Sequence, residues 1–379
     1  MVKMKKNKGI FYLAFAIASL YVIFINSCDR NGFDDDQNGQ NAHPTYEIEW
    51  VEEDLSDFVI YACDFFTDSL FVIDLATGNV KHQLKDFHRI ASVLTNHDGT
   101  RLYVSTHDPY DPTGTAGIYE IRTDTWERRK IYDNPAYLLS NNNGGVFFMT
   151  QYGGKSMRMF GEIDTDNGIA REIDSIDVVW KMHMDEGPIA IHPTEPILYA
   201  RSPHEFYSFN YEVRTKTVLP FLGGHWFILS GGGDTLYTAG SVIDLVNLKK
   251  VSSIPVPYSV FYVAARRDNK EIYITAPARD RWSDPPGKVY IFSPLEDMIM
   301  GEIDAGYYVS GNPYPYLTTG RIYLTPGQRY AIVGDDWAAY YIIDLKDRKI
   351  VETKVFVKKN LSPSIPMQYF YLAPKPPGL

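Results

Sequence analysis

Aromatic, guanidinium and carboxylate side chains gather in six long segments of this chain that lack the alternating pattern of a strand. These segments are 106–116, 151–159, 175–187, 277–287, 305–319 and 334–338. Trp and Tyr offer flat apolar faces with a polar edge, and Arg and Asp add hydrogen-bond donors and acceptors. The combination suits a sugar or another large polar ring, although packing between elements is a competing role for the aromatic residues. The predicted ligand contacts are Trp282, Arg281, Tyr314, Arg279, Tyr110, Tyr152, Trp180, Trp337 and Asp335.

Histidines recur near the ends of predicted strands, at His88, His107, His183, His204 and His225. A ring-shaped fold would bring such positions toward its axis, where imidazoles could bind a metal ion. His183 and His225 are the metal candidates, and a structural hydrogen bond at each site is the competing interpretation. The sequence contains no His-Glu-x-x-His, Gly-x-Ser-x-Gly or Walker A pattern. Catalytic residues therefore stay unassigned, and no cofactor is predicted.

One acidic pentapeptide resembles part of a calcium-binding loop. Asp164-Thr165-Asp166-Asn167-Gly168 lacks the downstream Glu of an EF-hand and falls between two predicted strands. A hairpin turn is the better interpretation.

A short apolar strand recurs seven times, at intervals of roughly 40–50 residues, and strand repeats of that period are typical of propeller blades. The copies are 71–75, 117–121, 160–163, 206–209, 241–245, 288–292 and 340–345. The residues taken as equivalent are Asp74, Glu120, Glu162, Ser208, Asp244, Ile291 and Asp344. Helical periodicity is not sustained outside the N-terminal segment, so the pattern predicts an all-β, seven-bladed propeller with four antiparallel strands (A to D) in each blade.

The two ends of the fold are predicted to share a blade. Residues 58–63 align with a second strand, so blade one lacks a first strand at its N-terminal end. Residues 367–373 resemble in sequence residues 260–265, which are predicted to form the first strand of another blade. We therefore expect the C-terminal strand to complete blade one innermost, which removes an open edge.

Strand parity predicts where recognition would occur. The A–B and C–D turns leave the blades at one face and are short, whereas the B–C and D–A connections leave at the other and include the six long segments. Long connections on a rigid scaffold are the usual place for binding.

The N-terminal residues read as export and anchoring signals. A lysine-rich start and an uncharged run from Ile10 to Ile25 predict a signal peptide over 1–27. The text before Cys28 resembles a bacterial lipobox, which would make Cys28 the lipidated N-terminus. The acidic, Gly/Asn-rich residues that follow predict a flexible tether over 28–56, ahead of a propeller over 57–379.

Charge and cysteine usage agree with this organisation. The net charge of −10 argues against nucleic-acid partners, and loss of the signal lysines makes the mature chain more acidic. The second cysteine, Cys63, lies in an apolar strand and is predicted to be a buried thiol.

The repeat texts at 98–105 (DGTRLYVS) and 71–80 (FVIDLATGNV) resemble the YVTN-type seven-bladed propeller family. The acidic tract after Cys28 is similar to the surface-export signal of Bacteroidota lipoproteins. Together these resemblances imply a lipoprotein exposed on the outer membrane. It would capture a glycan or a cobalamin-like solute on the long-loop face and serve an outer-membrane transporter. A propeller enzyme (a lyase, lactonase or hydrolase) and a protein-interaction scaffold remain the alternatives.

Overall fold

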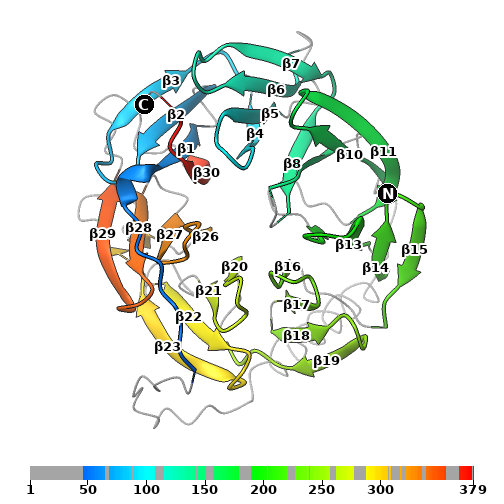
Figure 1. Ribbon diagram of the computed structural model, residues 1–379, viewed down its shortest axis with the longest axis vertical. Helices are drawn as coiled ribbons and strands as arrows, with labels where there is room; N and C mark the ends of the chain where they lie inside the picture. Colours follow the sequence, from blue (N-terminus) through cyan, green and yellow to red (C-terminus); the bar gives the residue numbers. More distant parts are fainter. Residues whose placement is uncertain are drawn as a thin grey trace, which may run out of the picture. The chain divides into compact units, whose positions relative to one another are not determined.

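The computed structural model describes residues 46–64, 68–87, 89–106, 115–141, 144–150, 157–178, 189–202, 204–220, 227–238, 240–256, 262–276, 287–305, 307–308, 316–317, 321–334, 339–355, 367–377 and 379. Seven four-stranded antiparallel sheets stand around a ring, as Figure 1 shows. A 3-10 turn, η1 (Leu55–Asp57), precedes the first strand. Within the described part of the chain, no helix is long and apolar enough to cross a membrane.

Each blade runs from an innermost strand (A) to an outermost strand (D), and the strands follow in that order. Blade 1 consists of β30 (Met367–Pro374), β1 (Phe58–Asp64), β2 (Ser69–Asp74) and β3 (Val80–Leu84). Blade 2 consists of β4 (Ile90–Thr95), β5 (Arg101–Thr106), β6 (Gly117–Arg122) and β7 (Arg128–Tyr132). Blade 3 consists of β8 (Ala136–Ser140), β9 (Val146–Thr150), β10 (Met157–Asp164) and β11 (Ile169–Asp177). Blade 4 consists of β12 (Ile189–Ile191), β13 (Ile197–Arg201), β14 (Phe206–Asn210) and β15 (Thr215–Val218).

The remaining blades follow the same order. Blade 5 consists of β16 (Phe227–Leu229), β17 (Thr235–Thr238), β18 (Ser241–Asp244) and β19 (Lys249–Ser252). Blade 6 consists of β20 (Tyr262–Ala265), β21 (Ile272–Ala276), β22 (Lys288–Ser293) and β23 (Met298–Asp304). Blade 7 consists of β26 (Ile322–Leu324), β27 (Tyr330–Gly334), β28 (Ala339–Asp344) and β29 (Lys349–Val355). A small hairpin, β24 (Tyr307–Tyr308) with β25 (Tyr316–Leu317), lies in the connection from blade 6 to blade 7.

The predicted closure of the ring is confirmed. Strand β30 pairs antiparallel with β1, with Val59 opposite Ala373 and Ile60 opposite Leu372. In Figure 1 the C-terminal strand lies on the inner side of the N-terminal one. A strand from one end of the chain therefore completes a sheet begun by the other, and blade 1 has no open inner edge.

The core lies between blades rather than within one blade. Strands B and C of each sheet are largely buried on both faces, as β9 is, whereas strand D is the most exposed, as β15 is. Val59 and Tyr61 of blade 1, for example, pack in one cluster with Val93 and Leu102 of blade 2. Cys63 belongs to this cluster and is 1% exposed, which confirms the predicted buried thiol.

A recurring turn joins strands C and D, and it corrects the equivalent positions expected from sequence. The fourth residue after the end of strand C has a positive φ in every blade: Gly78, Trp126, Gly168, Arg214, Leu248, Asp297 and Arg348. This geometry aligns Asp74, Asp244 and Asp344, as expected. In the other four blades the equivalent residues are Arg122, Asp164, Asn210 and Ser293, so Glu120, Glu162, Ser208 and Ile291 were the wrong choices.

The physical reason is the cap at the end of strand C. In the six blades other than blade 2, this residue's side chain accepts a hydrogen bond from the backbone N–H three residues later. Asp344 does so from Asp347, at 3.0 Å, and Asp164 does so from Asn167, at 3.1 Å. The pentapeptide that begins at Asp164 is therefore a hairpin turn, as expected.

Candidate functional site

The two faces of the ring differ in what they carry. We call the face with the A–B and C–D turns the turn face, and the face with the B–C and D–A connections the loop face. All strands of a blade are antiparallel, so every strand B ends at the loop face and every strand C begins there. The candidate ligand site belongs to the loop face, because the long segments start and end there.

The predicted ligand residues lie outside the described part of the chain. They are Trp282, Arg281, Tyr314, Arg279, Tyr110, Tyr152, Trp180, Trp337 and Asp335, together with the metal candidates His183 and His225 and the lipidation candidate Cys28. The structure fixes the strand ends on either side of the segments that hold the ligand residues. Strand β21 ends at Ala276 and β22 begins at Lys288, for instance, so the segment with Arg281 and Trp282 is rooted at the loop face.

Threonines strengthen these roots. Strand B ends in a buried Thr in three blades, at Thr106, Thr150 and Thr238, and in blade 6 the buried Thr275 is the residue before the strand end. The Thr106 hydroxyl accepts a hydrogen bond from the N–H of Gly117, at 2.9 Å, across the base of the long connection in blade 2. The Thr150 hydroxyl accepts one from Met159 in blade 3, at 3.2 Å. The scaffold below the candidate site is thus fixed by internal hydrogen bonds.

Two nearly buried arginines lie at the loop face, and neither was predicted from the sequence. Arg158 lies near the end of the segment 151–159, which contains Tyr152. It is 6% exposed, and its burial lowers its pKa. Arg321 follows the segment that contains Tyr314, is 9% exposed, and places its guanidinium 6.0 Å from the ring centre of Tyr262. A guanidinium at such a root suits a carboxylate, a phosphate or a polar ring. The sequence feature that could have identified such a residue is a charged side chain within an otherwise apolar strand, as in Met157-Arg158-Met159-Phe160.

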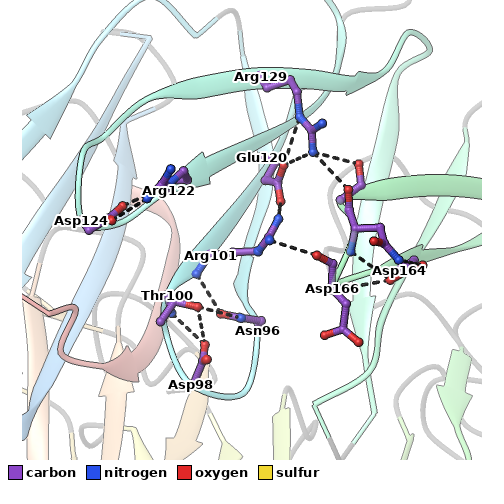
Figure 2. Close-up of polar contacts among 12 residues, drawn as sticks. Asn96, Asp98, Thr100, Arg101, Glu120, Arg122, Asp124, Arg129, Asp164 and Asp166 are labelled. Carbon is purple, nitrogen blue, oxygen red and sulfur yellow. Dashed lines mark hydrogen bonds and ion pairs between the residues drawn. The ribbon is translucent and has the colours of Figure 1, made fainter.

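The fullest polar network among the described residues lies away from the loop connections (Figure 2). Glu120 is 5% exposed and accepts hydrogen bonds from the guanidiniums of Arg101 and Arg129. Arg101 also donates to the carbonyl of Asp166 at 3.0 Å, and Arg129 donates to that of Gly168 at 3.3 Å. Both oxygens of the carboxylate are engaged by cations that reach into blade 3. The arrangement is an inter-blade clamp, and it does not resemble a general acid or base.

The described histidines offer structural roles. His192 is 8% exposed, and its Nδ1 accepts a hydrogen bond from the N–H of Glu195, at 2.9 Å, within an A–B turn. Burial lowers the pKa of His192. Among the described residues no three His, Cys, Asp or Glu side chains are grouped so as to hold a metal ion. The metal candidates predicted from sequence are untested and stay predictions.

The turn face carries a second feature, a strap formed by residues 46–57 that runs across blades 6 and 7 to β1 (Figure 1). Glu53 caps the A–B turn of blade 7, where its carboxylate accepts from the N–H groups of Gly327 and Arg329, at 2.6 and 3.0 Å. The Trp50 ring lies 4.6 Å from the Arg266 guanidinium, in the A–B turn of blade 6. These contacts are on the turn face. Residues ahead of 57, the predicted start of the propeller, therefore already pack against the ring.

Seven four-stranded blades closed by a shared first blade define the class: the protein is a seven-bladed β-propeller. No protein-family model and no curated protein sequence matches the chain. Its fold is similar to that of a protein of unknown function from Desulfotomaculum acetoxidans, with a TM-score of 0.56, 11% identity, and 79% of this chain and 95% of that one covered. The fold is also similar to that of apo AztD from Citrobacter koseri, with a TM-score of 0.55, 10% identity, and 83% and 98% covered.

A third similar structure is a provisionally assigned 6-phosphogluconolactonase of Bacteroides fragilis, with a TM-score of 0.55, 14% identity, and 84% and 98% of the two chains covered. At such low identity these structures share the fold alone. Propellers host unrelated functions, so function must be argued from the site.

Proposed function

We propose that this protein is a lipid-anchored, surface-exposed propeller that binds a solute at its loop face and delivers it to an outer-membrane transporter. The observation that carries the proposal is the strap on the turn face. The anchor end of the chain joins the ring on the face opposite the long connections. A membrane anchor placed there leaves the loop face open to solution.

Several contacts fix the start of the strap. Lys270 donates to the carbonyl of Glu47, at 2.5 Å. Tyr46, the first described residue, is half-buried beside Ser293, Glu271 and Arg348. Burial is the main cause of its raised pKa, and these three neighbours modulate it. Because all these contacts belong to turns of blades 6 and 7, Tyr46, the described residue nearest in sequence to the proposed lipid site Cys28, lies on the turn face.

Neighbouring A–B turns on the turn face are joined by hydrogen bonds. The backbone N–H of Gly231 in blade 5 donates to the Asn269 side chain in blade 6, at 3.3 Å. The N–H of Arg267 in blade 6 donates to the Gln328 side chain in blade 7, at 3.1 Å. Since strand A is the innermost strand, these A–B turns meet near the axis.

The composition of the long segments supports a glycan or a cobalamin-like solute. Trp282 and Tyr314 can stack on a ring, and Arg281 can donate to hydroxyl, amide or phosphate oxygens. Arg158, at the B–C connection of blade 3, and Arg321, at the connection into blade 7, add two more guanidiniums to this face. The predicted binding surface is thus aromatic and cationic, within a chain whose net charge is −10.

The test is a binding screen with cobinamide, cyanocobalamin and a panel of glycans, by isothermal titration calorimetry. We expect one probe class to bind. Trp282→Ala and Arg281→Ala should each weaken that binding at least about tenfold, the effect of losing one stacking or charge-assisted contact. The matched control is Asp124→Asn on the turn face, which should bind as the unmodified protein does. Absence of binding by every probe, or equal loss in the control, would contradict the proposal.

A further inference from the structure

The tips of the C–D turns are acidic in blades 2 and 3 and apolar in blades 5 and 6. The tip is the second residue after the end of strand C, which is Asp124 in blade 2 and Asp166 in blade 3, and both are exposed. In blades 5 and 6 the same position is Val246 and Leu295, which are 76% and 64% exposed. Equivalent turns with the same backbone geometry thus present opposite chemistry on two sides of one face.

The apolar tips belong to two adjacent blades, 5 and 6. The Ser252 hydroxyl of β19 donates to the Asp297 carboxylate in the C–D turn of blade 6, so the edges of blades 5 and 6 touch there. Leu248 and Met298, which are 41% and 43% exposed, lie in the same two turns or directly beside them. We call Val246, Leu248, Leu295 and Met298 the apolar edge. Exposed apolar side chains gathered in this way usually mark an interaction surface.

The start of the strap lies beside this edge. Tyr46 is next to Ser293, the cap of the turn whose tip is Leu295. The described chain therefore begins beside the apolar edge and not beside the acidic tips of blades 2 and 3. A flexible segment between Cys28 and Tyr46 would have an end-to-end distance of roughly 25 Å. A tether of that length would hold the apolar edge close to the surface that contains the anchor.

We propose that the apolar edge is a membrane contact, and that Val246 and Leu295 enter the interfacial region of the bilayer that holds the lipid of Cys28. This inference rests on the proposed lipid anchor. Tethering raises the effective concentration of the edge at the bilayer to the millimolar range, so a few apolar side chains suffice for contact. The exposed Lys249 and Lys250, next to Leu248, can place their ammonium groups at headgroup level.

Membrane contact at this edge would also orient the ring. With blades 5 and 6 nearest the bilayer, blades 2 and 3 with their acidic tips would be tilted toward solution. The ring would stand inclined on the membrane. This orientation would point part of the loop face sideways, toward a neighbouring membrane protein.

Site-directed fluorescence tests the proposal on the full, lipidated chain. V246C and L295C are labelled with an environment-sensitive thiol probe, and D124C and D166C are the matched controls at the same turn position. Cys63 is 1% exposed and stays unlabelled. The proteins are reconstituted in phosphatidylcholine vesicles with and without doxyl-labelled lipid. We expect several-fold stronger lipid-dependent quenching at positions 246 and 295 than at 124 and 166.

The outcomes separate the two proposals. The mass of the N-terminal peptide is measured first, and a Cys28 without lipid would overturn the proposed anchor and this inference together. Lipid on Cys28 with equal quenching at all four positions would overturn the membrane contact alone. Blue-shifted emission at 246 and 295 without lipid-dependent quenching would show a protein covering the edge, and would also overturn it.

Discussion

The carboxylate of Glu53 and the backbone N–H of Arg329 form a hydrogen bond of 3.0 Å between residues 276 positions apart in the chain. The same carboxylate accepts from Gly327. A side chain just ahead of the first strand thus completes a turn of blade 7, the last blade in the sequence. This contact fixes which face of the propeller carries the N-terminal strap.

Glu53→Ala should release the strap. The N–H groups of Gly327 and Arg329 would lose their acceptor, at a cost of about 1–3 kcal/mol. Residues 46–57 and the 325–329 turn should then exchange their amide hydrogens faster, while blades 2 to 4 keep their protection. Exchange mass spectrometry measures this, with Glu49→Ala at an exposed strap position as the control. Unchanged exchange in Glu53→Ala would show that the strap is held by other contacts.

Gly327→Ala should have a related effect. A Cβ at this position would lie 2.7 Å from the Glu53 carboxyl carbon, so the capping carboxylate must move. We expect faster strap exchange with little change in global stability. Exchange as slow as in the unmodified protein would mean that the turn adapts without displacing Glu53.

Closure by β30 should control the stability of the whole ring. Leu372 is 8% exposed and packs with Ile60 and Ile332 of blades 1 and 7. Leu372→Ala should lower the free energy of unfolding by about 2–4 kcal/mol through lost burial and a cavity. Leu248→Ala is the matched control, because Leu248 is 41% exposed and its truncation should change little. Equal urea midpoints for the two variants would contradict the closing role.

The Glu120 clamp should matter more than the neighbouring exposed ion pair. Glu120→Gln removes two ion pairs from a carboxylate that is 5% exposed, and leaves Arg101 and Arg129 without a counter-charge there. Because Arg129 itself is largely exposed, we expect the free energy of unfolding to fall by about 1–3 kcal/mol, which is less than the loss expected for a fully buried ion pair. Asp124→Asn breaks the exposed pair with Arg122 and should leave the unfolding midpoint unchanged. A larger loss in Asp124→Asn would reverse this assignment.

Buried tyrosines predict the alkaline limit of stability. Burial raises the pKa of Tyr61, Tyr103 and Tyr237 well above the ordinary value of 10.0. The unfolded chain therefore loses these protons first, so the stability present below pH 10 falls as the pH rises toward the folded-state pKa values.

Urea unfolding followed at rising pH measures this loss. The Tyr61 hydroxyl has no hydrogen-bond partner among the described residues, so Tyr61→Phe should keep its stability at neutral pH and lose less of it above pH 10. A variant with the same alkaline slope as the unmodified protein would show that other groups set the limit.

The sequence predicted the blades because each is local: a strand, a short turn and the next strand lie within one repeat. The residue predicted at the equivalent position was wrong in four blades. The prediction aligned the apolar strand sequences with one another, whereas the turns that follow them define the equivalent positions. Glu120 resembles the acidic residue of the other repeats, but the positive φ of Trp126 shows that Arg122 ends the strand. The geometry of the turn, and not the apolar pattern of the strand, therefore defines which residues are equivalent between blades.

The candidate site was less predictable. The strap depends on contacts such as Glu53 with Gly327, and no local pattern indicates a pairing across most of the chain. Arg158 and Arg321 were not predicted as site residues because they lie at the ends of apolar strands, and an apolar strand indicates packing rather than ligand binding. The ligand residues themselves stay predictions from segment length and composition.

The central claim, a lipid-anchored propeller that binds a solute on its loop face, is tested most directly by native mass spectrometry of the chain extracted from its own membranes. We predict a mature chain that begins at a lipidated Cys28 and carries a co-purifying small molecule. That molecule should be lost in Trp282→Ala and Arg281→Ala and kept in Asp124→Asn. An unlipidated chain, or a bound molecule retained equally by all three variants, would contradict the claim.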